Sequence, residues 1–139
     1  MTTKTRAAVE DLYRIAGNGK AEIVNGEIVL MSPTVDMPGR AGGAIYVRLR
    51  SFERQAGGRA YPDNVGFRVD LPNRKSFSPD AAFYTGKPSG MKFLEGAPVF
   101  AAEVRSENDY GDKAEIEIAA SYQASERIGC HKLVWGREH

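Results

Sequence analysis

The order of helix-like and strand-like segments predicts an α/β (α+β) fold, in which helices pack against a β-sheet. Amphipathic helical periods precede and follow a series of short strands, and an Asn-Gly dipeptide joins two strand-like runs. Residues 98–104 form a nearly continuous apolar run, typical of a strand covered on both faces. The 139 residues can bury one modest core, so we expect a single domain spanning residues 1–139.

The composition is that of an ordinary globular protein, with 42% apolar and 27% charged residues. A formal net charge of +1 gives no overall electrostatic signal for nucleic acid or anionic membrane, although it leaves a local basic cleft open. The single cysteine, Cys130, has no partner for an internal disulfide, and no apolar run approaches the length of a membrane span or signal-peptide core. These features predict a cytoplasmic location.

The N-terminal part of the chain predicts a short helix followed by a hairpin. Apolar residues spaced by four and three positions favour a helix over residues 7–16, which the glycine-rich residues 17–19 would end. Strand-like runs at residues 21–24 and 27–31 flank Asn25-Gly26, a dipeptide preferred in type I′ turns because both residues tolerate positive φ.

A longer amphipathic helix is expected from Pro38 to about Ala56, because apolar residues recur every three or four positions and Gly57-Gly58 can end it. We interpret the arginines on its other face as a solvated helix surface rather than a DNA-binding patch. These arginines are Arg48, Arg50 and Arg54.

The rest of the chain predicts most of the sheet and one further helix. The expected strands are residues 59–61, 66–70, 76–84, 98–104 and 132–135, with a polar turn at 71–75 and a loop at 86–96. A helix over residues 110–127 would begin after the capping residues 106–109 and end at Gly129.

Two carboxylates stand at the ends of expected strands. Asp80 follows Pro79, whose missing amide hydrogen suits a strand start or an edge, and Glu103 lies inside the apolar run. A buried carboxylate is costly unless it is paired, protonated or bound to a cation. Two acids that converge can hold a hard divalent metal, whereas the alternative is that each caps a helix or meets an arginine.

Five segments, in consistent order and spacing, carry a family resemblance. They are EIVNGE at 22–27, MSPT at 31–34, NVGF at 64–67, SPDAAF at 78–83 and AEVRSEND at 102–109. The series resembles the Uma-two family of restriction endonucleases, whose fold is the PD-(D/E)XK nuclease core, and it covers residues 22–120. The resemblance implies a restriction endonuclease-like core with a central mixed sheet flanked by helices, a bound Mg²⁺ or Mn²⁺, and hydrolysis of DNA phosphodiester bonds.

The resemblance also implies roles for four residues. Asp80 and Glu103 fall on the motif acids that hold the metal, and Glu22 falls on the acid before the Asn-Gly turn. The alternative role for Glu22 is that of a solvent-facing strand residue. Arg105 stands two residues after Glu103, where this nuclease fold often has a lysine. Arginine cannot act as a base, but it can stabilise developing phosphate charge.

The C-terminal part departs from the family pattern. Ser121 occupies the position where many members carry a lysine on the following helix, and the resemblance fades from there, which predicts a shortened C-terminal region. Two readings therefore stay open: a metal-dependent nuclease, impaired by the missing lysine, or a non-catalytic binding or assembly module on the same scaffold. An exposed sheet edge would also allow a homodimer.

Overall fold

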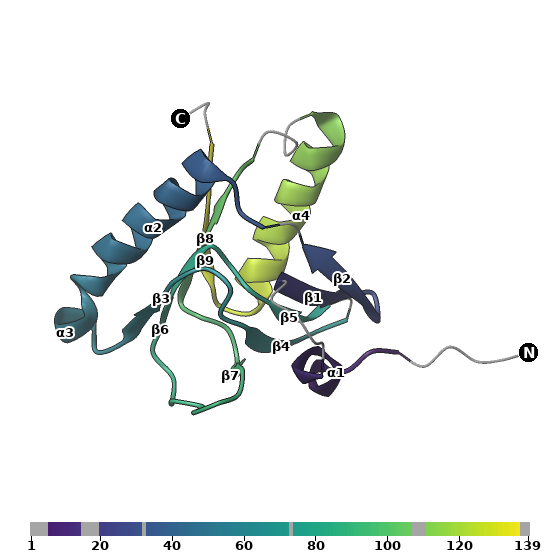
Figure 1. The fold of residues 1–139 in the computed structure, drawn as a ribbon, viewed down its shortest axis with the longest axis horizontal. Helices are drawn as coiled ribbons and strands as arrows, with labels where there is room; N and C mark the ends of the chain where they lie inside the picture. The colour runs from purple at the N-terminus through teal and green to yellow at the C-terminus, as the bar shows by residue number, and fades with distance from the viewer. Residues whose placement is uncertain (1–5, 15–19, 32, 73, 107–110, 137–139) are drawn as a thin grey trace, which may run out of the picture.

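The computed structural model describes residues 6–14, 20–31, 33–72, 74–106 and 111–136. Figure 1 shows the elements along the chain. They are α1 (Val9–Tyr13), β1 (Lys20–Val24), β2 (Glu27–Met31), α2 (Asp36–Arg50), α3 (Glu53–Ala56), β3 (Arg59–Tyr61), β4 (Phe67–Leu71), β5 (Arg74–Phe77), β6 (Ala81–Tyr84), β7 (Leu94–Glu95), β8 (Phe100–Val104), α4 (Asp112–Arg127) and β9 (His131–Trp135).

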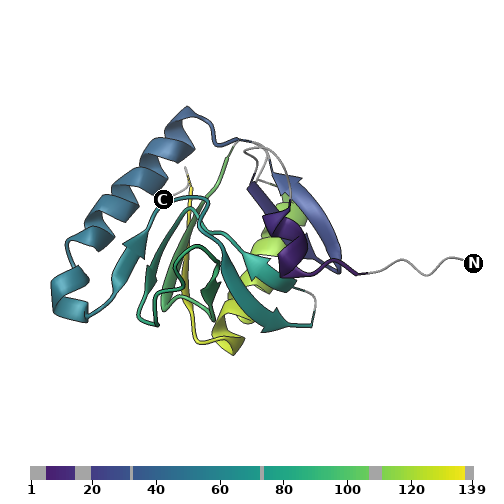
Figure 2. The ribbon, with the colours of Figure 1, turned by 60° about the horizontal axis from the view of Figure 1, so that its bottom comes forward.

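The strands form two mixed sheets flanked by helices, which confirms the predicted fold class. One sheet has the order β2-β1-β5-β4-β7 and the other the order β3-β6-β8-β9. Each sheet contains one parallel pair, β4 with β7 and β8 with β9, among antiparallel neighbours. Helix α2 contacts β3, β6 and β8, whereas α4 contacts β9. Figures 1 and 2 both show the strands of the second sheet between these two helices.

The hairpin predicted around Asn25-Gly26 is confirmed. Both residues have positive φ, 52° and 79°, as a type I′ turn requires. Val24 pairs directly with Glu27 across the turn, and the register continues to Lys20 opposite Met31. The sequence therefore fixed this part of the first sheet through local turn chemistry.

The helix predicted over residues 110–127 is present as α4, Asp112–Arg127, whereas the other two predicted helices are shorter or more divided than expected. Helix α1 covers only Val9–Tyr13, and the expected stop at residues 17–19 lies outside the described residues. Helix α2 begins earlier, at Asp36, and ends at Arg50, so the expected continuous helix to Ala56 is wrong. The Ser51 hydroxyl donates to the Arg48 carbonyl at 2.6 Å, competing with the helical ladder, and the chain resumes as α3.

The expected strand over residues 76–84 is also divided, because three residues interrupt it between β5 and β6. Pro79 has no amide to donate, and the Ser78 amide donates to a side chain instead of a neighbouring strand. The expected turn at 71–75 is too wide, since β4 ends at Leu71 and β5 begins at Arg74. The expected loop at 86–96 contains β7, which pairs with β4.

The main core packs aromatic and aliphatic side chains from both sheets. Phe67, which is fully buried, stacks against Phe77 and Tyr84 with ring centroids 5.8 and 5.7 Å apart. Ala82 of β6 and Ala101 of β8 complete the contact between the sheets. This core holds β5, β6 and β8 in place; Asp80 directly precedes β6, and Glu103 lies in β8.

Helices α2 and α4 are the longest in the described part of the chain, at 15 and 16 residues. Across that part, no helix combines the length and the apolar character needed to cross a bilayer.

Candidate functional site

The ladder between β6 and β8 brings Asp80 and Glu103 to the same end of the second sheet. Its last pair is Ala81 with Ala102, so Asp80 comes just before this pair and Glu103 just after it. The Asp80 amide donates to the Ala102 carbonyl at 2.9 Å, and its Oδ2 atom accepts the Val104 amide at 2.6 Å. The Asp80 carboxylate is therefore bound to the residue that follows Glu103.

Helix α2 forms one wall beside Asp80. A Cβ atom placed on Gly42 would lie 3.5 Å from the Asp80 Cβ, so the missing side chain lets the helix lie close to the strand. Gly42 itself is buried. The half-buried Asp80 carboxylate thus lies between helix α2 and the end of β8, and the Val104 amide holds it there.

Glu103 occupies the next-to-last position of β8, paired with Val134 of β9. Residues two apart on a strand face the same side, so Glu103 shares a face with Ala101, which belongs to the core. Continuing the β6–β8 register by one residue places Asp80 opposite Glu103, so both acids lie at this end of the ladder. Both are half-buried, and both take part in polar interactions.

Two carboxylates suit Mg²⁺ or Mn²⁺, which usually keeps several waters and takes few protein ligands. A cluster of three or more acidic, histidine or cysteine ligands is not found among the residues that the structure describes. The donor chemistry of Asp80 and Glu103 fits a hard cation, provided that water and substrate oxygens supply the remaining ligands.

Glu22 of β1 is buried and contacts the segment that joins the first sheet to the second. Its Oε2 atom accepts the Ser78 amide at 2.8 Å and lies 3.7 Å from the Arg74 guanidinium. Only 7% of the residue is exposed, so the alternative of a solvent-facing strand residue is wrong. Because Ser78 is two residues before Asp80, Glu22 holds the segment that leads into the site.

Arg105 is paired with a carboxylate on α4. Its Nη2 atom lies 2.6 Å from Glu115 Oε1, and only 7% of the arginine side chain is exposed. Its amide donates to the Trp135 carbonyl at 2.9 Å, which continues the β8–β9 ladder. Arg105 therefore fastens α4 to the sheet, and Glu115 neutralises part of its charge.

A cavity of about 510 Å³ adjoins Glu22 and contains the position of the expected lysine. Ser121 lines this cavity, and its hydroxyl donates to the Ile118 carbonyl at 2.8 Å. Lys132 of β9 lines the same cavity. Lys132 was not predicted from the sequence, because it carries no motif and its position depends on the β8–β9 register. The side chain of Lys113 lies outside the described residues.

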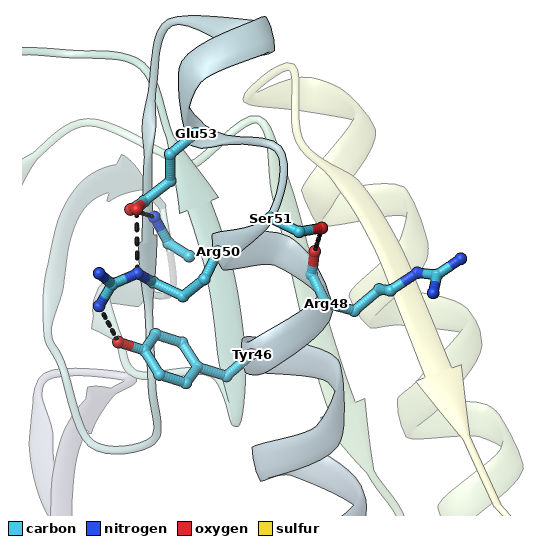
Figure 3. A network of polar contacts seen from close by, with 6 residues as sticks. Tyr46, Arg48, Arg50, Ser51 and Glu53 are labelled. Atoms are coloured by element: carbon cyan, nitrogen blue, oxygen red, sulfur yellow. Dashed lines mark hydrogen bonds and ion pairs between the residues drawn. The ribbon is translucent and has the colours of Figure 1, made fainter.

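Arg48 and Arg50 lie on different sides of α2. Figure 3 shows Arg50 beside Tyr46 and Glu53, with Arg48 pointing to the other side of the helix. Arg50 donates to the Tyr46 hydroxyl at 2.9 Å and pairs with Glu53 at 2.9 Å, and these contacts raise the pKa of Arg50. Arg50 is thus part of a local network at the end of the helix.

The two mixed sheets, with flanking helices and acids at the end of one ladder, define a nuclease-like fold. The structure superposes with a TM-score of 0.70 on the crystal structure of "a putative nuclease belonging to DUF820" from Anabaena variabilis. The match covers 95% of this chain and 75% of that one, at 11% sequence identity, so it bears on the fold alone.

The chain belongs to the Uma2 family, described as "Putative restriction endonuclease", whose family model matches residues 9–128. This result confirms the resemblance found in the sequence. No match was found among curated proteins.

Proposed function

We propose that the protein is a metal-dependent endonuclease that hydrolyses DNA phosphodiester bonds. The observation that carries the proposal is the meeting of Asp80 and Glu103 at the end of the β6–β8 ladder, in a chain of the Uma2 family. A divalent ion, when bound, would polarise the scissile phosphate and activate a water.

The roles of the chain's own residues follow from their contacts. Asp80 and Glu103 would hold Mg²⁺ or Mn²⁺, and the Val104 amide would orient the Asp80 carboxylate. Glu22 would position the segment that carries Asp80. Arg105 would stabilise phosphate charge, with Glu115 setting the direction of its guanidinium.

The test is cleavage of single-stranded, double-stranded and branched DNA by the purified protein with Mg²⁺ or Mn²⁺. Asp80→Asn and Glu103→Gln should each lower the rate at least about a hundredfold, because each removes a ligand charge. Asp70→Asn is the matched control, since Asp70 pairs with Lys75 on an exposed surface. Loss of activity on addition of EDTA should be reversed by excess Mn²⁺. Cleavage that survives in both site variants would refute this assignment.

A specific feature favours the second candidate, a binding or assembly module that forms a homodimer. All five residues of the edge strand β2 are exposed, and Leu30 is 68% exposed. An apolar edge strand can pair with its symmetry mate. Size-exclusion chromatography with light scattering should give a dimer that Leu30→Lys converts to a monomer. A wild-type monomer at micromolar concentration would contradict the dimer, and an inactive dimer would favour the module over the nuclease.

The proposal treats residues 1–139 as one restriction endonuclease-like domain, which should unfold in a single cooperative transition. It also places the protein in the cytoplasm, where a lone cysteine such as Cys130 is kept reduced.

A further inference from the structure

We propose that Lys132 contacts a DNA phosphate at the cavity beside Glu22, supplying the cation that Ser121 does not. The inference rests on the proposed function, because it takes DNA as the ligand. It assigns a positioning role to a strand residue rather than to a residue of the helix.

The parallel register of β8 and β9 places Lys132 near Glu103. Lys132 pairs with Ala101, and Val134 pairs with Glu103. Residues two apart on a strand share a face, so Lys132 lies on the same face as Glu103, about 7 Å before it along the strand direction. The flexible four-carbon stem of lysine can span much of that separation.

The cavity connects Lys132 with the acid at the other sheet. Glu22 and Lys132 both line it, with Ser121 and Ser125 of α4 between them in the chain. The same Glu22 carboxylate holds the Ser78 amide, two residues before Asp80. An anion bound in this cavity would therefore lie beside the segment that carries the proposed metal ligand.

No carboxylate forms an ion pair with Lys132 among the side chains that the structure describes, which leave out those of residues 112–114 and 117. Neighbouring cations have carboxylate partners, since Arg74 lies beside Glu22 and Arg105 beside Glu115. Lys132 is half-buried and lines the cavity. A phosphate oxygen that enters the cavity can accept a charge-assisted hydrogen bond from its ammonium.

The competing explanation is that Lys132 only packs its aliphatic stem and exposes its ammonium to water. The two explanations differ in what a change of charge does. If only the stem matters, Lys132→Gln should fold normally and bind DNA as the wild type does. If the ammonium contacts a phosphate, that variant should lose one ionic contact.

The test measures binding of a fluorescent phosphorothioate DNA duplex, which resists cleavage, by anisotropy in Ca²⁺ at increasing NaCl. Lys132→Gln should weaken binding roughly eightfold at 0.1 M salt and reduce the slope of log Kd against log salt by about 0.9, the value for one phosphate contact. Lys132→Arg should retain the slope, which also guards against a general folding defect. Lys92→Gln is the control for loss of one charge, because Lys92 lies in an exposed loop.

The outcomes separate this inference from the proposed nuclease activity. A wild-type slope in Lys132→Gln, or an equal change in Lys92→Gln, overturns the phosphate contact alone. A change that appears in Lys113→Gln but not in Lys132→Gln also overturns it. Lys132-dependent binding without cleavage in Mn²⁺ supports the contact and refutes the nuclease. A wild-type protein that does not bind the duplex refutes both.

Discussion

Glu22 offers the sharpest test of how the site is held together. Replacing it with alanine removes the acceptor for the Ser78 amide, and both residues are buried. An unsatisfied buried amide costs about 1–3 kcal/mol. The longer contact with the partly exposed Arg74 adds at most about 1 kcal/mol. We therefore expect Glu22→Ala to lower the free energy of unfolding by about 1–4 kcal/mol.

Glu22→Gln is the matched variant, because its amide oxygen can still accept the Ser78 amide while the charge is lost. A hydrogen bond to a neutral acceptor is weaker than one to a carboxylate by about 1 kcal/mol, and burying the neutral side chain recovers part of that loss. The expected destabilisation is therefore no more than about 1 kcal/mol. If cleavage also requires the charge, Glu22→Gln should lose activity while keeping its stability.

Urea unfolding followed by far-UV circular dichroism measures both variants. With a typical slope of about 2 kcal/mol per molar urea, the midpoint should fall by about 0.5–2 M for the alanine variant and by at most about 0.5 M for the glutamine variant. Equal losses in the two variants would mean that the charge, rather than the hydrogen bond, stabilises the fold. Two unchanged midpoints would show that the contact contributes nothing.

Three further predictions concern packing, titration and metal binding. Gly58→Ala should destabilise the fold by about 1–3 kcal/mol, because the new Cβ would lie 2.5 Å from Phe83 Cε1. Gly43→Ala should stabilise α2 by up to about 1 kcal/mol, because its Cβ would have nothing within 4 Å. Thermal melting of the two variants compares these effects. Burial raises the pKa of Cys130 from 9.0 to about 11, so its thiol should react slowly with Ellman's reagent until the protein unfolds. Because the thiol ionises at lower pH in the unfolded chain, the free energy of unfolding should be constant below pH 9 and fall by up to about 3 kcal/mol as the pH rises to about 11. Urea titrations at each pH would detect this fall. The pH dependence should disappear in Cys130→Ala. Mn²⁺ at one hundred times its Kd should raise the free energy of unfolding of the wild type by about 2.7 kcal/mol and leave that of Asp80→Asn unchanged. A wild-type Tm that does not depend on Mn²⁺ would argue against a bound ion.

Local signals in the sequence predicted the parts of the fold that depend on neighbouring residues. The Asn25-Gly26 turn fixed the β1–β2 register, and Gly57, with φ of 70°, ended the helical region as expected. The family segments identified the right scaffold because they carry long-range information that propensities do not. The positions of Asp80 and Glu103 at one sheet end followed from that scaffold.

The errors arose where tertiary contacts override local pattern. The residues after Ser76 were predicted to form one strand. The Ser78 amide instead donates to Glu22, more than fifty residues away in the sequence, and this contact helps to divide the strand. Glu22 itself alternates like an exposed hairpin residue, and only its contact with another strand buries it. Lys132 carried no motif, and its proximity to the acids depends on the β8–β9 register.

The bond between Asp80 and the Val104 amide has a spectroscopic consequence. An oxygen atom shared with a cation becomes a weaker acceptor, so loading the ion should move the Val104 resonance upfield and quicken its exchange with solvent deuterium. The Val104 amide peak would therefore report how much of the site is occupied by metal. This measurement needs no substrate and works even if the protein cleaves DNA too slowly to detect.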